Sequence, residues 1–217
     1  MTGSETPPAA RTRGGYAKGD RRRAEILNTA FFAFAAGGYR SASMVQIAAA
    51  CGVSRAGLQH HFPTKEALLT AVLEERDRIN GELFFQGSAP QRDGIDYLRR
   101  LLDVVAHNVT QREIVALFAV LSAEASDPEH PAHAYFVARY RWLRTDIDDA
   151  LAEAERSGRA RPGALQPGLA SDLIALIDGL QVQWLLEPGS VDIVERLRGR
   201  LQDIVTADLS VSTRRTS

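Results

Sequence analysis

The side chains best suited to chemistry lie in the segment SRAGLQHH, residues 54–61. A helix over this segment would turn four residues outward, namely Arg55, Ala56, Gln59 and His60. An arginine guanidinium hydrogen-bonds guanine through two N–H groups, and a glutamine amide pairs with adenine in the same way. Ser54 and Gly57 are small and would let the helix lie deep in a groove. The segment therefore predicts a helix that reads base edges in the major groove of double-stranded DNA, with a solvated helix face as the alternative.

The residues around this segment predict the element that must hold it. Ile47 and Ala48 are apolar or small at helical spacing, and Gly52 interrupts the pattern because glycine adopts a left-handed turn without steric cost. Ser54 is a good N-cap for the next helix, and Leu58 returns to the core. Two short helices joined in this order are typical of a DNA-binding helix-turn-helix. These residues alone leave an ordinary helical hairpin open.

The stretch from Ala24 to Glu74 resembles the TetR family of bacterial transcription regulators. The matching features are Gly38-Tyr39 after the first helix, Ser43 opening the second, Ile47-Ala48, Gly52-Val53-Ser54, and Phe62 followed by Lys65. The resemblance implies an all-α fold, with an N-terminal three-helix helix-turn-helix domain followed by a larger helical ligand-binding and dimerisation domain. It also implies a homodimer that binds a palindromic operator, usually as a repressor, and releases it when a small-molecule ligand binds. The alternatives are a ligand-independent activator or architectural DNA binder, and a helical small-molecule-binding protein or enzyme with an incidental motif.

Three residues are predicted to contact DNA phosphates, which position a protein without reading sequence. They are Tyr39 through its hydroxyl, Ser43 and Lys65. The family usually places Tyr or Phe, which packs on a phosphate, at the position of Gln59. The glutamine here favours a base contact instead.

The charge distribution places the expected DNA contact at one end of the chain. The 217 residues carry a net charge of −1, yet residues 1–70 have a balance of +5 and the remainder −6. A basic N-terminal module on an acidic body suits a polyanion bound at one end. Residues 1–18, with Arg11, Arg13 and Lys18, and residues 211–217 are predicted to be disordered tails, the first of them basic and within reach of DNA.

No membrane segment, secretion signal or enzyme is predicted. The chain has no run of 18 apolar residues and no apolar core near its start, so a cytoplasmic protein is expected. Phosphate-binding glycine loops and hydrolase or protease motifs are absent, so we expect the protein to have no enzyme activity and no cofactor. His60-His61 and His130-x-x-His133 lack a third ligand nearby, so no metal site is predicted.

The domain boundary is expected within the fourth helix, between a DNA-binding domain over residues 19–66 and a regulatory domain over residues 67–210. Thr64 is a candidate N-cap for this helix, which would extend to about Phe85. The other long helices are expected over residues 21–36, 95–110, 113–125, 132–157, 169–186 and 191–209. The two domains would therefore be joined stiffly and not by a flexible linker.

A ligand pocket would draw on the aromatic and polar residues that interrupt the apolar C-terminal helices. These are His107, Phe118, Glu124, Tyr135, Arg139, Trp142, Asp178, Gln181 and Trp184. Each of them also fits an ordinary place in a helical core.

The last two helices are predicted to hold the homodimer together. Residues 169–186 are too apolar to face solvent, and Gly179 would permit close approach of a second helix. The final helix repeats apolar residues at steps of three and four, at Val194, Leu197, Leu201 and Ile204. This pattern predicts a seam within a four-helix bundle formed by two subunits. The alternative is that these helices close the core of the monomer.

Overall fold

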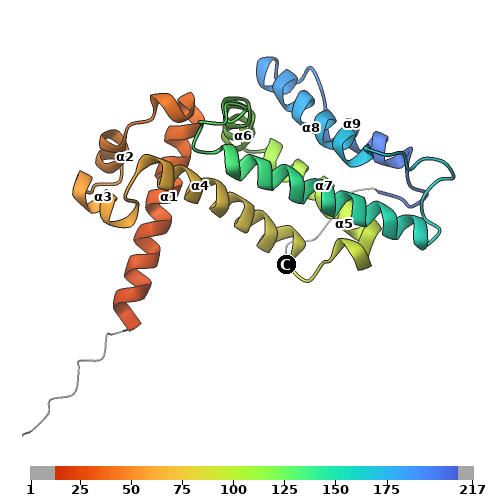
Figure 1. Ribbon diagram of the computed structural model, residues 1–217, viewed down its shortest axis with the longest axis horizontal. Helices are drawn as coiled ribbons and strands as arrows, with labels where there is room; N and C mark the ends of the chain where they lie inside the picture. Colours follow the sequence, from red (N-terminus) through yellow and green to blue (C-terminus); the bar gives the residue numbers. More distant parts are fainter. Residues whose placement is uncertain (1–12, 210–217) are drawn as a thin grey trace, which may run out of the picture.

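The chain is an all-α protein in the computed structural model, which describes residues 13–209, with side chains from residue 19 onward. The helices are α1 (Arg13–Ser41), α2 (Met44–Ala50), α3 (Arg55–His61), α4 (Lys65–Asn80), α5 (Pro90–Val109), α6 (Arg112–Glu124), α7 (His133–Arg156), α8 (Leu169–Leu186) and α9 (Ile193–Gln202). Figure 1 shows α1, α2 and α3 as a small module at one end, the larger body at the other, and α4 running between them. Residues 13–209 form no strand, so the predicted fold class is confirmed.

Helix α1 is longer than predicted at both ends. It begins at Arg13, so residues 13–18 are helical where a disordered tail was predicted. Its backbone breaks at Gly37 and Gly38, where the dihedral angles leave the helical region, as the double glycine predicts. The predicted contact of Arg11 with DNA and the tail at residues 211–217 lie outside the described residues, as do the side chains of Arg13 and Lys18.

Capping side chains and one proline set the starts of the following helices. The Thr64 hydroxyl accepts the Ala67 N–H at 3.1 Å, as expected of an N-cap for α4. Helix α4 ends at Asn80, and a single π-helical turn over Gly81–Phe85 replaces the predicted continuation. Helix α5 begins at Pro90, before the predicted start at residue 95. Proline fits the first helical position because the backbone N–H that it lacks would have no partner within the helix.

Two apolar cores hold the molecule together, and they do not divide at the predicted boundary. The first joins the inward faces of α1 to α4 to those of α6 and the start of α7, through residues such as Phe34, Leu69 and Leu117. The second joins α5, α7, α8 and α9, through residues such as Leu98 and Leu173. Helix α6 therefore packs on the DNA-binding module as well as on the body.

The predicted dimer seam on α9 is wrong. Leu197 and Leu201 are completely buried and Ile204 is 1 % exposed, because they pack in the second core of their own chain. Val194 is half-buried against the same core. A repeat at steps of three and four indicates only that one helix face is covered, and here the covering residues belong to the same chain.

Helix α8 is apolar on two opposite sides. Leu173, Ile174 and Leu180 lie in the second core. The other side exposes Ala175, Gly179, Val182 and Leu186, at steps of four, three and four. Leu186 is 82 % exposed and Val182 is 48 % exposed. Among the described helices, α8 alone is long and apolar enough to cross a bilayer by itself, while α5 and α6 pass the same test only as a pair bent by 103°. Core helices of soluble proteins also meet this criterion, so it is weak support for a membrane segment.

Candidate DNA interface and ligand pocket

The turn between α2 and α3 has the geometry that its sequence predicts. Gly52 has a φ of +64°, in the left-handed region that favours glycine. The N–H of Val53 then donates to the Ala48 carbonyl at 3.0 Å, which closes the end of α2. The Ser54 hydroxyl accepts the Gly57 N–H at 3.0 Å and caps α3. Local hydrogen bonds thus set the direction in which α3 leaves the turn.

Helix α3 presents its polar side to solvent. Arg55, Ala56, Gln59 and His60 are all exposed. Leu58 is completely buried in the core that contains Ile47 and Ala48. This burial fixes the rotation of α3, so the four outward residues share one free face as predicted.

The three residues predicted to contact phosphates lie at the edge of the same module. The Tyr39 hydroxyl donates to the Glu66 carboxylate, and burial together with this bond raises the pKa of Tyr39 well above its usual range. The ammonium of Lys65 lies 4.3 Å from the centre of the Tyr39 ring. Ser43 is the N-cap residue of α2, but its side chain makes no capping bond. The structure therefore holds Tyr39 in place through Glu66 and Lys65, and leaves the Ser43 hydroxyl unused by the helix.

Glu124 does not line the pocket, contrary to its predicted role. It lies at the end of α6 and accepts the Tyr39 N–H at 3.0 Å. Gly38, with a φ of +73°, permits this approach, because a Cβ at residue 38 would lie 2.5 Å from the Glu124 Oε1. The His130 Nε2 lies 3.5 Å from Glu124 Oε2, the same oxygen that accepts the Tyr39 N–H. Glu124 therefore ties the regulatory body to the DNA-binding module.

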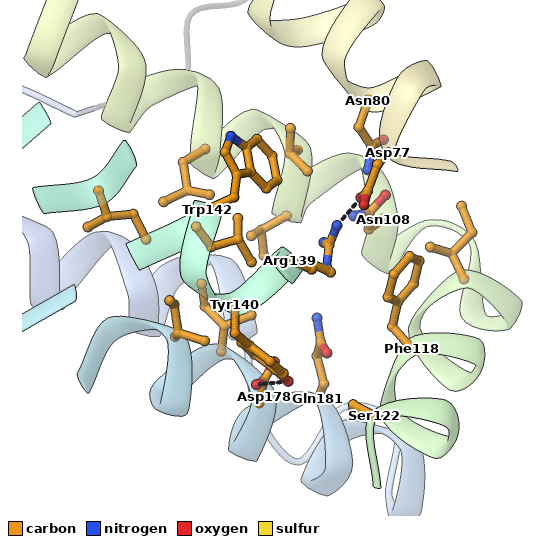
Figure 2. A pocket seen from close by; sticks show the side chains of 18 of the residues that line it. Asp77, Asn80, Asn108, Phe118, Ser122, Arg139, Tyr140, Trp142, Asp178 and Gln181 are labelled. Atoms are coloured by element: carbon orange, nitrogen blue, oxygen red, sulfur yellow. Dashed lines mark hydrogen bonds and ion pairs between the residues drawn. The ribbon is translucent and has the colours of Figure 1, made fainter. Parts of the chain in front are cut away.

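A cavity of about 120 Å³ lies within the body and is lined by side chains from α4 to α8. Five of the predicted ligand-contact residues line it, namely Phe118, Arg139, Trp142, Asp178 and Gln181. Figure 2 shows Asp77, Asn80 and Asn108 beside Arg139, with Asp178, Tyr140 and Gln181 on the other side of that arginine.

Trp184 lies outside this lining, with the centre of its ring 5.5 Å from the Arg112 guanidinium, and so do two further predicted residues. The ring of His107 lies 5.3 Å from that of Phe84, and its Nε2 is 2.9 Å from the amide of Gln111. The Tyr135 hydroxyl donates to the Asp77 carboxylate from outside the cavity. Both side chains are aromatic residues in helices, but the rotation of those helices places them away from the space.

An ion pair closes the cavity on the side of α4. Arg139 of α7 donates to the Asp77 carboxylate, and their side chains are 19 % and 25 % exposed. Burial lowers the pKa of Arg139 to about 10, while the nearby Tyr140 and Asp178 oppose that shift. The guanidinium therefore remains positively charged at neutral pH, and its charge is matched by Asp77.

Asp178 is the second carboxylate of the lining. The Tyr140 hydroxyl donates to it at 2.7 Å, and burial raises the pKa of Asp178 above its usual range. No cation of the described residues lies within ion-pair distance of this carboxylate. The cavity thus contains one acid in an ion pair and one acid that is hydrogen-bonded, with the Arg139 charge acting on the second from beyond ion-pair distance.

Sequence reasoning missed several polar lining residues, which are Asp77, Asn80, Asn108, Ser122 and Tyr140. One signal was available for the first of them. Asp77 follows Leu69 and Leu73 at steps of four, so it continues the buried stripe of α4 with a charge. A charged residue on a buried helix face indicates a partner or a pocket.

Hydrogen bonds within the connection between α6 and α7 hold two of the histidines, His130 and His133. The Nδ1 of His133 lies 2.8 Å from the Ala125 carbonyl, and the Nδ1 of His130 accepts the Ala132 N–H at 3.2 Å. Within residues 13–209, no group of three or more His, Cys, Asp or Glu side chains has the spacing of a metal site.

Comparison with known proteins covers nearly the whole described chain. A family model of bacterial regulatory proteins of the tetR family matches residues 26–72. A model of the C-terminal domain of BetI-type transcriptional repressors matches residues 95–211, more than half of the 217 residues.

Individual relatives match most of the chain or one part of it. The regulator TtgR of Pseudomonas putida is 28 % identical over 179 residues, which cover 79 % of this chain and 84 % of that protein. UidR of Escherichia coli is 44 % identical over 57 residues, covering 26 % and 29 % of the two chains.

Solved structures agree with this organisation. A TetR-family regulator from a Rhodococcus species has a TM-score of 0.67 at 27 % identity and covers 84 % of this chain and 97 % of its own. A complex of SmeT, a repressor from Stenotrophomonas maltophilia, with triclosan has a TM-score of 0.73 at 22 % identity, covers 89 % and 96 %, and shows similarity of fold alone. The exposed face of α3, the two matched family models and these relatives agree, and the chain therefore belongs to the TetR family, as a DNA-binding transcriptional regulator of the repressor type.

Proposed function

We propose that the protein is a homodimeric repressor that leaves its operator when a small molecule occupies the cavity in its body. The observation that carries this proposal is that one helix, α4, follows the DNA-binding helix α3 and also lines the cavity. Helix α4 begins four residues after the end of α3 and ends with Asp77 and Asn80 in the cavity lining. A ligand that contacts these two side chains therefore contacts the helix that joins the DNA-binding module to the body.

Coupling between the two sites follows from the absence of a flexible joint along α4. Its residues Leu68, Leu69 and Leu73 are completely buried in the first core, so the helix moves together with that core. A ligand that binds better when α4 is displaced must lower operator affinity, and operator DNA must lower ligand affinity by the same factor. The SmeT–triclosan complex supports the view that a protein with this fold holds a small molecule.

Operator readout is assigned to the outward face of α3. Arg55, Gln59 and His60 would read base edges, with Ser54, Ala56 and Gly57 against the groove floor. Tyr39, Ser43 and Lys65 would contact phosphates at the edge of the module.

The exposed apolar side of α8 is the proposed dimer interface. Ala175, Gly179, Val182 and Leu186 form a continuous stripe, and a Cβ at Gly179 would meet nothing within 4 Å in the monomer. A two-fold axis beside this stripe would bury the same patch on both subunits. Because α8 also packs in the second core and contributes Asp178 to the cavity lining, a partner subunit explains this stripe better than a lipid bilayer does, in keeping with a cytoplasmic regulator that has no catalytic role.

The dimer is tested by light scattering on a Val182→Arg/Leu186→Arg double variant. Both side chains are exposed, so the variant should fold and have the mass of a monomer. Arg196→Ala/Arg200→Ala, at exposed polar positions of α9, is the matched control and should remain dimeric. An unchanged dimer mass in the folded α8 variant would place the interface elsewhere.

Ligand control is tested by fluorescence anisotropy with labelled DNA from the region upstream of the coding sequence. Metabolites that raise the melting temperature should release this DNA, and Gln181→Ala should weaken their effect without changing operator affinity. Gln183→Ala, on the same helix but outside the cavity lining, is the control. If the metabolites that raise the melting temperature leave operator affinity unchanged, ligand control is contradicted and a ligand-independent regulator is favoured.

A further inference from the structure

We propose that the cavity selects an organic amine, with a protonated primary or secondary amino group that donates to Asp178 and an apolar body of about one aromatic ring. This inference rests on the proposed function, because it names the ligand class of the same cavity. Charge, size and hydrogen bonding each support it separately.

The net charge of the lining residues favours a cationic ligand. The charged lining residues are Asp77, Arg139 and Asp178, which together carry a net charge of −1 when ionised. Arg139 is already paired with Asp77. Asp178 accepts the Tyr140 hydroxyl and has no ion-pair partner of its own, because the Arg139 charge that acts on it is shared with Asp77. An ammonium group beside Asp178 would neutralise the lining.

The dimensions of the cavity limit the rest of the ligand. Its volume of about 120 Å³ is slightly smaller than that of engineered apolar cavities of about 150 Å³ that bind benzene. Phe118, Phe136 and Trp142 supply apolar walls, and aromatic faces also attract cations. The space therefore limits the apolar body to a single ring.

Hydrogen bonding favours an amine that carries N–H groups. The Tyr140 hydroxyl occupies one acceptor position of the Asp178 carboxylate, which leaves positions for further donors. At the other end of the cavity, the Oδ1 atoms of Asn80 and Asn108 are buried without a hydrogen-bond partner. Asn80 is 8 % exposed, and a buried acceptor without a donor is costly. The lining thus has an excess of acceptors, and those of Asp178 would stay unpaired beside a quaternary ammonium, which has no N–H group.

A carboxylate ligand fits the same lining poorly. It would bring a third negative charge beside Asp77 and Asp178, and it would have to displace Asp77 to reach Arg139. The breaking of that pair would leave a buried carboxylate uncompensated.

The test is isothermal titration calorimetry of the full chain with four probes that share a phenyl ring and a two-carbon spacer. They are 2-phenylethylamine, its N,N,N-trimethyl derivative, 2-phenylethanol and 3-phenylpropionate. The amine should bind about tenfold or more tightly than the alcohol, since only the amine pairs with the buried charge. The trimethyl compound should fall between these two, and the propionate should bind most weakly. The inference is overturned if another probe binds as tightly as the amine, or if none of the four binds.

Two matched variants assign the preference to one carboxylate. Asp178→Asn keeps an oxygen for Tyr140 but removes the charge, so the amine and the alcohol should bind within about threefold of each other. Asp172→Asn removes an exposed charge from the first turn of the same helix and should keep the full preference. A preference that survives in folded Asp178→Asn would refute the role of Asp178.

The wild-type series needs no substitution, so it decides the ligand class even if Asp178→Asn does not fold. It also separates this inference from the proposed function. Release of operator DNA by a neutral or acidic compound would refute the amine and leave ligand control in place.

Discussion

The face of α3 and the cavity both present polar side chains from helices, but they hold those side chains in different ways. On α3, Arg55 and Gln59 are four residues apart, and a cap and a turn within ten residues fix their direction. In the cavity, Arg139 meets Asp77 across 62 residues of sequence, and Tyr140 meets Asp178 across 38. One surface is local and exposed, and the other is buried and assembled by packing.

This difference predicts different consequences of substitution. A side chain on α3 is free of the core, so its loss should change DNA binding and leave folding intact. Asp77 and Arg139 in the cavity wall have been largely removed from water and paired, so the loss of either should change stability first. Substitutions at the two sites should therefore separate in unfolding and binding experiments.

The largest effect is expected for Asp77→Ala, which leaves Arg139 buried and unpaired. The free energy of unfolding should fall by about 3 kcal/mol, measured by urea denaturation. Glu82→Ala breaks the exposed pair between Arg78 and Glu82 and should cost less than about 1 kcal/mol. Equal costs for the two variants would mean that the cavity pair behaves as a surface pair.

Arg55→Ala should have the opposite profile. Operator affinity should fall by about 1–3 kcal/mol through relaxed preference at one base pair, while the urea midpoint stays unchanged. Anisotropy with operator and random DNA measures the first, and denaturation measures the second. An equal loss on both DNAs would make Arg55 a phosphate contact.

The stability effect of Asp178 should depend on pH. Burial raises the pKa of Asp178 in the folded protein above its unfolded value, so folding favours the protonated acid. Ligand-free wild-type protein should therefore lose stability as pH rises through the interval between these two values. Asp178→Asn lacks this loss, so its melting temperature relative to wild type should increase with pH. A difference independent of pH would show that Asp178 is not desolvated.

The smallest effect is expected for Lys65→Ala. Removal of one phosphate contact should reduce the slope of log affinity against log salt by about 0.9 and weaken operator and random DNA alike. Ser54→Ala, which removes a cap and no positive charge, is the comparison and should leave the slope unchanged. A slope unaltered by Lys65→Ala would remove Lys65 from the phosphate contacts.

The sequence was most informative where structure depends on neighbours along the chain. The left-handed Gly52, the caps at Ser54 and Thr64, and the bounds of α8 all follow from short patterns. Five cavity residues were also found, because polar and aromatic residues in apolar helices are few.

The errors concern which surface a helix face meets. Leu197 and Leu201 form a genuine apolar stripe, but periodicity does not state whether a stripe meets its own chain or another. Glu124 is a charge at the end of an apolar helix, and only the path of α1 brings Gly38 against it. Asp77 was missed because α4 was taken as a connector and not as a cavity wall.

Under the proposed ligand control, helix α4 would act as a lever between the cavity and the DNA-binding module. At 1.5 Å per residue, its backbone spans about 18 Å from Asp77 to Lys65. A rotation of about 10° around the cavity end would carry the other end through about 3 Å, which is the length of one hydrogen bond. In a two-fold dimer both modules would move, so their separation could change by up to about 6 Å against a half-site repeat of about 34 Å. A small ligand could therefore shift the two recognition helices out of register with successive turns of the major groove without unfolding any part of the chain.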